Sequence, residues 1–535
     1  KGKGQEGKGG KHAGAGPGRD FSSPLQRSLL GALGNYMDVA IPHRTPPKEP
    51  CATLADGGSD PVMDAYLLHA INHVLKGADY VKKNNDKAKA AGAAADPPRD
   101  QGFTRPKVLI LLPVRSAALR VVARLLQLLP MVSPDRPDSV LEQERFEREF
   151  GEEEGDGGEL DRLLAEAEVK KKRARWAREG RPLTDEQAAA MVEAQLARGQ
   201  KPEDHRAMFG GNSDDHFRAG IKLTRKAVKI FAQFFQSDIV IASPLALITH
   251  MEEGEAAVDY LSSIELVVAD HMDVMLMQNW MHVEGVFEAV NKTPVEQHGV
   301  DFMRVREHYL NGWGRHFRQT VLLGAFPSPQ VNGLAGRLCS NWEGQARLRA
   351  PEPGVLSRVM APVRQVYTRI PCRGPEEASD ARFEHFTKEV WPKLRDSLSS
   401  GQLLFVPSYF DFVRLRNFLV KERASFASLS EYSKTSDVAR ARGQFFHKKV
   451  KLLVYTERAH FYHRYRIRGI NSVVFYQLPE YCHFYAEVLN TMESSEGPQC
   501  AVVFTKFDRL QLERVVGSTR APRMCKSDNS TFMFC

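Results

Sequence analysis

Short apolar runs alternate with amphipathic stretches along most of the chain. The runs, such as residues 108–112 and 264–268, are rich in β-branched side chains. Such runs are typical of buried strands, whereas apolar residues that recur every three or four positions are typical of helices. Strands that alternate with helices form parallel sheets from βαβ units. The pattern therefore predicts an α/β protein.

The alternation occurs once in each half of the chain. In the first half it predicts strands at 107–113, 238–242, 264–269 and 319–323. It predicts helices at 64–75, 221–235, 245–251, 280–291 and 301–309, and a further helix directly after the strand at 107–113. In the second half it predicts helices at 382–397, 409–421, 437–446 and 481–491, with strands at 363–368, 402–406, 450–455, 472–476 and 501–505. We therefore expect two tandem parallel-sheet lobes.

The starts and stops of this alternation divide the chain into segments. They are a flexible, extended basic N-terminal tail (1–60), a first lobe (61–330), a connector (331–360) and a second lobe with a C-terminal extension (361–535). The first lobe is interrupted at about 135–212, where an acidic stretch precedes a basic block. We interpret this insertion as charged, solvated helices on the surface. A nuclear-targeting role for the basic block at 170–175 is the alternative.

Composition favours a folded protein and disfavours a disulfide framework, a zinc module and a membrane span. The chain of 535 residues is 42% hydrophobic, and its net charge of +8 is compatible with a polyanionic partner. The seven cysteines include no CxxC pair, which disfavours a disulfide framework and a zinc module. No apolar run approaches the roughly 20 residues of a membrane span. We expect a folded multidomain protein without a membrane partner, and not a homo-oligomer.

No phosphate loop of the ordinary kind is visible. The only approach to GxxxxGK[ST] lies at residues 2–9, where the last position is Gly9 and neither a strand nor a helix is predicted nearby. We interpret this match as a coincidence within the basic tail. The sequence therefore predicts no nucleotide cofactor and no metal site.

Residues at the ends of the predicted strands resemble the motif series of DEAD-box RNA helicases. The matches in the first half are Pro113-Val114-Arg115 with PTR, Ile241-Ala242-Ser243-Pro244 with ATPGR, Asp270-His271-Met272-Asp273 with DEAD, and residues 318–326 with RQTLLFSAT. The matches in the second half are residues 403–407, Arg440 with Phe446, Thr456-Glu457, residues 468–471, and Pro479 with Tyr485. The ordered series implies two RecA-like, helicase-type lobes.

The departures from this series fall on the residues that hydrolyse ATP. His271 stands where the water-orienting Glu would be, and an imidazole that is mostly neutral near pH 7 does not replace a carboxylate beside magnesium. Val488 stands where an arginine would stabilise the transferred phosphoryl group. We therefore predict no catalytic residues. Asp270 and Asp273 are expected to cap the following helix or to bond to backbone groups, with cation binding as the alternative.

This combination is similar to the digestive-organ expansion factor family, U3 small nucleolar RNA-associated proteins of the small-subunit processome. The stretches that carry the resemblance are residues 67–75, 99–106, 211–217 and 277–280. The resemblance implies a helicase-shaped, ATPase-dead assembly factor of the nucleus and nucleolus that is needed for pre-rRNA processing. Its implied partners are pre-rRNA or U3 small nucleolar RNA and other processome proteins.

Candidate RNA contacts are basic. The stretch 440–468 interleaves cations with aromatic rings, as single-stranded RNA binding requires, and contains Arg440, Arg442, Arg464, Arg466 and Arg468. Core packing of the rings and ordinary salt bridges of the arginines are the alternative, as is contact with protein partners. The helicase resemblance adds Arg115 and Ser243, whose alternative role is local hydrogen bonding at strand ends.

Three functions remain open from the sequence. The first is a non-catalytic scaffold within a pre-ribosomal particle. The second is an active ATP-dependent RNA helicase with an atypical nucleotide site. The third is a free-standing RNA-binding module.

Overall fold

Two units make up the computed structural model of the chain. The first unit contains residues 1–153, 210–324 and 330–348, and the second contains 154–209, 325–329 and 349–535. The structure describes residues 21–45, 58–91, 97–133, 136–151, 201–492 and 499–535, together with separate positions at 51–54 and 169–192. The tail at 1–20, with its partial phosphate-loop match, lies outside the described residues, as does about half of the insertion.

The first unit is built on a nine-stranded sheet in the order β3-β5-β4-β6-β2-β7-β8-β1-β9. Strand β4 runs antiparallel to β5 and β6, and the other pairs are parallel. The strands are β1 (Asp38–Ile41), β2 (Val108–Leu111), β3 (Val140–Leu141), β4 (Arg218–Leu223), β5 (Val228–Ile230), β6 (Ile239–Ala242), β7 (Leu266–Ala269), β8 (Gln319–Leu323) and β9 (Gln345–Arg347).

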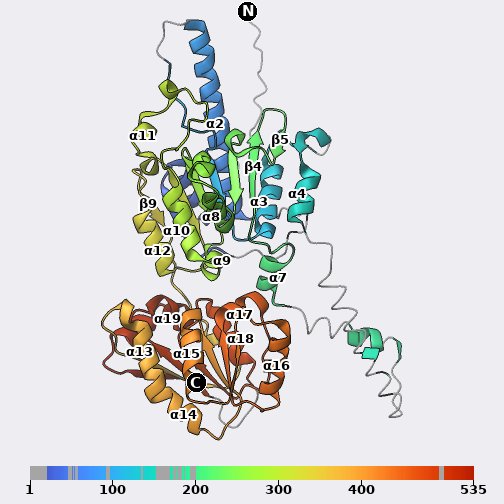
Figure 1. Cartoon of the computed structure of the whole chain (residues 1–535), viewed down its shortest axis with the longest axis vertical. Coiled ribbons are helices and arrows are strands. Elements are labelled where there is room, and N and C mark those ends of the chain that lie inside the picture. The colour runs from blue at the N-terminus through green and yellow to red at the C-terminus, as the bar shows by residue number, and fades with distance from the viewer. Residues whose placement is uncertain are drawn as a thin grey trace, which may run out of the picture. The chain divides into compact units, whose positions relative to one another are not determined.

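Helices connect the strands of the first sheet (Figure 1). They are α1 (Pro24–Gly34), the long α2 (Pro61–Ala91), α3 (Arg115–Leu128), α4 (Gln143–Phe150), α8 (Pro244–Glu252), α9 (Met272–Met277), α10 (Trp280–Ala289), α11 (Glu307–Leu310) and α12 (Pro329–Arg337). The three central strands β2, β6 and β7 are buried at every position. Full burial explains why these strands are continuous apolar runs in the sequence.

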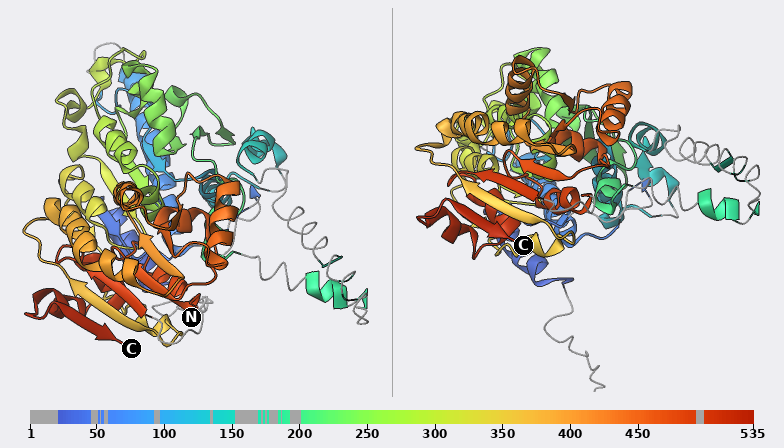
Figure 2. Two further views of the ribbon diagram at one scale, coloured as in Figure 1. Left: turned by 60° about the horizontal axis from the view of Figure 1, so that its bottom comes forward. Right: turned by 90° about the horizontal axis from the view of Figure 1, so that it is seen from below.

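The second unit is built on a seven-stranded sheet in the order β12-β13-β11-β14-β15-β10-β16 (Figure 2). Only β16, at one edge, runs antiparallel to its neighbour. The strands are β10 (Arg364–Arg369), β11 (Gln402–Val406), β12 (Phe426–Leu429), β13 (Leu452–Thr456), β14 (Ser472–Phe475), β15 (Gln499–Phe504) and β16 (Thr531–Phe534).

The helices of the second unit include one from the insertion. They are α7 (Glu203–Phe209), α13 (Ala378–His385), α14 (Trp391–Asp396), α15 (Tyr409–Lys421), α16 (Thr435–Phe446), α17 (Glu457–His463), α18 (Cys482–Asn490), α19 (Arg509–Val516) and α20 (Ala521–Lys526). A π-helical turn at Phe386–Val390 joins α13 to α14. The insertion therefore interrupts the first lobe in sequence, whereas α7 packs within the second unit.

The strand register of the first sheet brings the candidate residues of that unit to one edge. Leu111 pairs with Ala242 on one side and with Ala269 on the other. Ala269 pairs with Leu322, whose neighbour Leu323 pairs with Ile41. Because parallel strands end at the same edge, the residues that follow these strands lie there, which is where α/β proteins bind ligands.

The predicted α/β fold with two tandem parallel-sheet lobes is confirmed. The helix predicted at 221–235 is wrong, because the segment forms β4 and β5 and a single 3₁₀ turn. Thr224 closes the hairpin, donating its backbone N–H and its hydroxyl to the carbonyl of Ala227. Alternation of apolar and polar residues on each side of this turn was the missed signal.

Residues 24–41 also differ from the expected extended segment, since they form α1 and β1. Ser23 caps α1 by accepting the Gln26 N–H at 3.1 Å, and Pro24 occupies the first turn. The helix predicted at 301–309 is reduced to a 3₁₀ turn at Phe302–Arg304 and the short α11. In the described part of the chain, no helix combines the length and the apolar character required to cross a membrane.

Candidate functional site

Asp270, the first carboxylate of the DEAD-like motif, is bound by an arginine of the same unit. Arg44 Nε lies 2.5 Å from Asp270 Oδ1, and the guanidinium also donates to Oδ2 at 2.8 Å. Asp270 is fully buried, and Arg44 is 5% exposed. Tyr66 of α2 donates its hydroxyl hydrogen to Oδ2 at 3.2 Å. Both carboxylate oxygens therefore already have charged or hydroxyl donors.

Arg44 belongs to the connection between β1 and α2. Strand–loop–helix is the arrangement in which phosphate loops hold their anion, with the helix amino terminus as the binding site. Here the Asp60 carboxylate lies at the amino terminus of α2 and accepts the Val62 and Met63 N–H groups at 2.9 and 3.1 Å. Arg44 bonds to the other oxygen of Asp60 at 2.6 Å. An internal carboxylate thus accepts the first N–H groups of α2.

The charges of this cluster stabilise one another. Burial alone raises the pKa of Asp270, but the charges of Arg44 and His271 and the bonds from these residues lower it to about 2. Burial likewise opposes the charge on Arg44, yet the carboxylates of Asp270 and Asp60 raise its pKa well above the usual value. Asp270 is ionised and Arg44 protonated at neutral pH.

His271 and Asp273 occupy the turn that leads into α9. His271 adopts a left-handed backbone conformation (φ 59°), and its N–H donates to Asp270 Oδ1 at 2.8 Å. Burial lowers the pKa of the His271 imidazole, so this side chain is neutral near pH 7. Asp273, in the first turn of α9, is also buried.

These residues do not fit a magnesium–nucleotide complex. Magnesium requires free carboxylate oxygens, whereas Asp270 carries Arg44 and Tyr66. The residues before α2 are Gly58, Ser59 and Asp60, so an acidic residue and no lysine stands next to the helix. In the second unit, Val488 is buried within α18. We therefore derive no step through ATP.

The two helicase-like RNA candidates of the first unit are engaged locally. Arg115 donates to the carbonyls of Glu149 and His216 at 2.7 and 3.0 Å, and pairs with Asp214 at 2.8 Å. Ser243 is fully buried, and its Oγ accepts the Ala246 N–H at 3.1 Å as the cap of α8. Both geometries correspond to the alternative of local hydrogen bonding at strand ends.

Four of the basic candidates of the second unit, all except Arg440, line a groove of about 620 Å³. Its charged lining contains five cations and one carboxylate: Lys201, Arg442, Arg464, Arg466, Arg468 and Glu487. The loop that contributes three of these arginines follows α17, and Arg464 itself adopts a left-handed conformation (φ 45°) where that helix ends. Lys201 comes from the insertion, immediately before α7.

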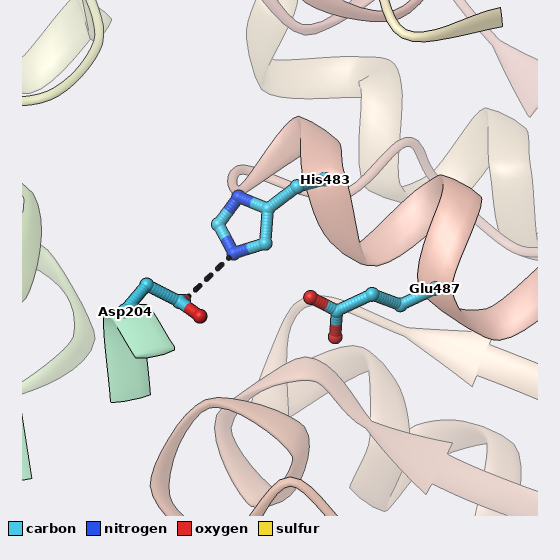
Figure 3. Close-up of side chains that lie close together, drawn as sticks. All are labelled: Asp204, His483 and Glu487. Carbon is cyan, nitrogen blue, oxygen red and sulfur yellow. Dashed lines mark ion pairs between the residues drawn. The ribbon is translucent and has the colours of Figure 1, made fainter. Parts of the chain in front are cut away.

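Arg464 differs from its neighbours because it is buried between carboxylates. It donates to Glu487 at 2.9 and 3.1 Å and to Asp204 of α7, and its guanidinium lies 4.2 Å from the ring centroid of Phe484. Figure 3 shows Asp204 facing His483 and Glu487, which come from α18. The ligand atoms of these three residues lie within 4.8 Å of one another. Arg464 already supplies a cation to both carboxylates, so we assign no metal to them.

Contacts of Lys201 and α7 hold this part of the insertion on the rest of the second unit. His205 bonds to the Tyr462 carbonyl at 2.9 Å, and Lys201 bonds to the carbonyl of His463. The ring of Phe209 packs edge-on against Phe461, with the centroids 5.2 Å apart. Despite burial, His483 and Arg464 lower the pKa of Asp204, which keeps this carboxylate ionised.

Three of the six Phe and Tyr rings of the 440–468 stretch belong to the core. Phe445, Tyr455 and Phe461 are each less than 5% exposed. Tyr465 is half-buried, and its ring stacks on His463 with the centroids 4.9 Å apart. Arg442 and Lys201 lie 5.6 and 5.7 Å from the same ring. Phe446, at the end of α16, is 45% exposed, so its ring is accessible to a partner.

The remaining arginines are accessible. Arg440 is exposed on α16 and pairs with Asp437, while Arg442 is half-buried and donates to the Arg466 carbonyl at 3.1 Å. Arg466 and Arg468 are exposed. Among the described residues, neither of these two side chains has a recorded carboxylate partner.

Arg44, Asp60 and Tyr66 were missed by sequence reasoning. The Asp60-Pro61 dipeptide is a helix-start signal that places the beginning of α2 before the expected residue 64. Strand β1, with only four residues, carries little periodicity. Asp204 and Lys201 were missed because they lie in the charged insertion, where nothing in the pattern indicates a contact with a distant segment.

Sequence comparison identifies both units. Residues 36–346 match the family domain described as UTP25, NTP hydrolase-like domain, and residues 355–534 match the Utp25 C-terminal domain. The chain belongs to the UTP25 family. The family resemblance carried by residues 67–75, 99–106, 211–217 and 277–280 is thereby confirmed, and the NTP hydrolase-like description agrees with a helicase-type first lobe.

Relatives match over nearly the whole chain. The chain is 41% identical to Protein NUCLEOLAR FACTOR 1 of Arabidopsis thaliana, over 97% of this chain and 66% of that protein. It is 39% identical to the U3 small nucleolar RNA-associated protein 25 homolog of Rattus norvegicus and 38% identical to that of Homo sapiens, over 97% and 96% of this chain. It spans 64% and 63% of the length of those two proteins.

Solved structures of DEAD-box proteins also match at low identity. A DEAD box protein from Methanococcus jannaschii is 12% identical, with a TM-score of 0.26 over 94% of this chain and 90% of that one. The yeast DEAD-box splicing factor Prp28 is 12% identical, with a TM-score of 0.28 over 90% of this chain and 77% of that one.

Proposed function

We propose that this chain is a non-catalytic, helicase-like scaffold of the small-subunit processome. It associates with the U3 snoRNP and is required for processing pre-rRNA to small-subunit rRNA. Its partners are pre-rRNA or U3 small nucleolar RNA and other processome proteins, and it acts in the nucleolus. Support comes from membership of the UTP25 family and from the names of relatives, which record association with U3 small nucleolar RNA and a nucleolar factor.

The occupied carboxylate of Asp270 carries the non-catalytic part of this proposal. An ATPase of this class uses that carboxylate to hold magnesium beside the phosphates. Here it is bonded at both oxygens to Arg44. Displacing Arg44 from Asp270 would break a buried ion pair, and the loss of one partner from such a pair costs about 3–5 kcal/mol. The pair therefore opposes magnesium binding.

An ATPase assay tests this conclusion. We expect the purified chain to hydrolyse ATP with magnesium and RNA no faster than its Asp270→Asn variant, which keeps the shape of the side chain and removes its charge. RNA-stimulated turnover that disappears in Asp270→Asn would instead establish the alternative, an active helicase with an atypical site.

Sedimentation of cell extracts tests the scaffold role. A processome component should run with large precursor particles, and its depletion should cause unprocessed pre-rRNA to accumulate. A free-standing RNA-binding module would run near the mass of the chain, 60.1 kDa, and its depletion would leave pre-rRNA processing intact.

A further inference from the structure

We infer that a pocket at the amino edge of the first sheet binds a segment of a partner protein that is rich in acidic and aliphatic residues. The inference rests on the proposed function only for the expectation of protein partners. The pocket has a volume of about 410 Å³, which is within the range of ligand sites. It is lined by α2, by the segment that leads into β2, and by residues next to β6 and β7.

The pocket lies at the opposite edge of the sheet from the DEAD-like motif. Lys107, Asp238 and Glu265 directly precede β2, β6 and β7, and all three residues line the pocket. Because these strands pair in parallel, the residues before them share one edge. Asp270 follows β7 at the other edge. The pocket is therefore separate from the Asp270 cluster.

The long helix α2 forms one wall of the pocket. Its lining residues run from His73 to Asn85, which at 1.5 Å per residue is about 18 Å of helix. An extended peptide of about five or six residues has the same length. Gly77 and Ala78 leave space beside the helix, and among the described residues a Cβ atom on Gly77 would have no neighbour within 4 Å outside the backbone of α2. This elongated shape favours a chain segment over a compact small molecule.

Two of the carboxylates that line the pocket are balanced by arginines of the same unit. Arg304 donates to both oxygens of Asp100 at 2.8 Å. Arg105 donates to the two oxygens of Asp238 at 2.8 and 3.2 Å. These pairs are internal to the unit, so they leave no negative charge that would repel an acidic ligand.

The third carboxylate, Glu265, faces more cations than it can balance. Its Oε1 lies 2.9 Å from both Lys107 Nζ and Arg306 Nη1, and its Oε2 lies 2.9 Å from His73 Nε2. Burial opposes its ionisation, but Lys107, His73 and Arg306 lower its pKa well below the ordinary value. Lys82 adds an exposed ammonium group, for which the described residues hold no recorded carboxylate partner. Positive charge therefore exceeds negative charge along the lining, which selects an acidic ligand.

Aliphatic side chains supply the apolar part of the lining. They include Val74 and Val81 of α2 and Val300 on the opposite side. In the described lining, the one aromatic ring is that of His73, whose Nδ1 is bonded to the Tyr36 hydroxyl at 2.9 Å. Bases of single-stranded RNA stack on accessible aromatic faces. The lining therefore suits aliphatic side chains better than bases.

Apolar surface continues next to the pocket. Phe302, two residues after Val300, is 49% exposed, and its ring packs edge-on against Phe103 with the centroids 6.3 Å apart. Phe103 itself lies between two lining residues, Gly102 and Thr104. A bound segment can therefore cover an exposed ring as well as fill the pocket, and a few such buried anchors supply most of the energy of a protein interface.

Fluorescence anisotropy of the full chain with synthetic peptides tests the inference. The probe is a short peptide that alternates Glu with Leu, and the comparison peptides alternate Lys with Leu and Glu with Ser. We expect each comparison peptide to bind at least about tenfold more weakly, because one lacks the acidic charge and the other the apolar contact. Equal binding of all three peptides, or binding of none, would overturn the inference.

Two variants block the pocket in different ways. Gly77→Leu fills the open space beside α2, and because leucine favours a helix more than glycine does, the thermal unfolding midpoint should not fall. Lys82→Glu reverses the charge of the exposed lysine in the lining. Each variant should weaken binding of the Glu–Leu peptide by about tenfold or more. Unchanged affinity in both variants would overturn the inference.

Each variant has a matched control outside the lining. Gly31→Leu makes the same change at an exposed glycine of α1 that also has open space beside it. Lys83→Glu makes the same charge change at the next exposed lysine of α2. Both controls should stay within about twofold of the wild-type affinity. Equal losses in a variant and its control would overturn the inference in favour of net charge or a general effect on the fold.

Two other occupants are outcomes of the same variants. If Gly77→Leu abolished binding of a fluorescent U20 oligoribonucleotide and Gly31→Leu did not, the pocket would belong to RNA and the inference would be wrong. A dimer in sedimentation equilibrium that Gly77→Leu dissociates would assign the pocket to a second copy of the chain, and this result too would overturn the inference.

Cross-linking identifies the occupant inside precursor particles. With a photo-reactive residue in place of Ala78, we expect a cross-link to a protein segment rich in acidic and aliphatic residues, whereas a cross-link to RNA would contradict the inference. A chain that binds the Glu–Leu peptide in this pocket but never sediments with precursor particles would overturn the scaffold role alone. A chain that sediments with those particles but binds no acidic peptide would overturn the pocket assignment alone.

Discussion

The two clusters of arginine in this chain make opposite use of the same side chain. In the first unit, Arg44 is buried and its guanidinium contacts the carboxylates of Asp270 and Asp60. In the second unit, Arg466 and Arg468 are exposed, without a recorded carboxylate partner in the described residues. The first cluster is complete by itself, whereas the second retains charge that an external anion can use.

The comparison shows which arginines can belong to a binding site and which are part of the folded structure. A buried ion pair that loses one member leaves an isolated charge in a low-dielectric environment, which is strongly destabilising. An exposed arginine remains hydrated, so its loss changes stability little. Pairing, and not the presence of an arginine, therefore separates a structural cluster from a candidate contact surface.

The largest expected effect comes from Arg44→Ala. We expect the free energy of unfolding of the first unit to fall by about 3–5 kcal/mol, because Asp270 stays buried without its counter-charge. Urea denaturation, with hydrogen exchange of β7 amides as the unit-specific signal, measures this loss. Arg225→Ala breaks an exposed pair with Asp79 in the same unit and should change stability by less than about 1 kcal/mol.

A double variant sharpens the same comparison. Arg44→Met/Asp270→Asn removes both charges, so its loss should be smaller than the sum of the two single losses. Strict additivity of the single variants would show that Arg44 and Asp270 do not act as a pair.

The next effect compares two arginines of one loop. We expect Arg464→Gln to lower the stability of the second unit by about 2–3 kcal/mol, because Asp204 and Glu487 lose their shared cation. Arg466→Gln should stay within about 0.5 kcal/mol. Thermal and urea unfolding of the two variants measure the difference, and equal losses would contradict the different pairing of these two arginines.

The pH dependence of stability tests the Asp270–Arg44 pair without changing Arg44. Folding lowers the pKa of Asp270 from its ordinary value of 3.8 to about 2. A lowered pKa stabilises the fold above the unfolded value, so this contribution of about 2 kcal/mol is complete above pH of about 4 and disappears toward pH 2. Urea unfolding between pH 2 and 5 should show a steeper fall in the wild type than in Asp270→Asn. If stability fell equally steeply with pH in both proteins, the Asp270–Arg44 pair would not be the cause of the fall.

The smallest effect distinguishes a helix cap from an RNA contact. Ser243→Ala should cost about 1 kcal/mol, because α8 loses the acceptor for the Ala246 N–H. RNA affinity of the chain should be unchanged, since Ser243 is fully buried. Ser243→Asn retains a capping acceptor and should recover part of the stability. A loss of RNA affinity in both variants, with folding intact, would assign Ser243 to the RNA surface.

Much of the fold could be predicted from periodicity. The strands β8 and β11 have the predicted bounds, 319–323 and 402–406, and β2, β6 and β7 differ from prediction by one or two residues at an end. These strands are buried on both faces, so their composition is dominated by apolar, β-branched side chains whatever lies next to them. The hairpin at β4 and β5 could not be separated from a helix by its apolar content alone.

The sequence by itself determined the family, the two-lobe architecture and the presence of His271 at the second position of the DEAD-like motif. Each of these is a local property of residue type and order. Only the tertiary structure decided that Arg44 binds Asp270, 226 positions away, and that α7 holds Arg464 through Asp204. Ion pairs between residues this far apart in sequence depend on which segments the sheets bring together. The sequence shows that a residue is charged, but not whether it is paired in the interior or exposed at the surface.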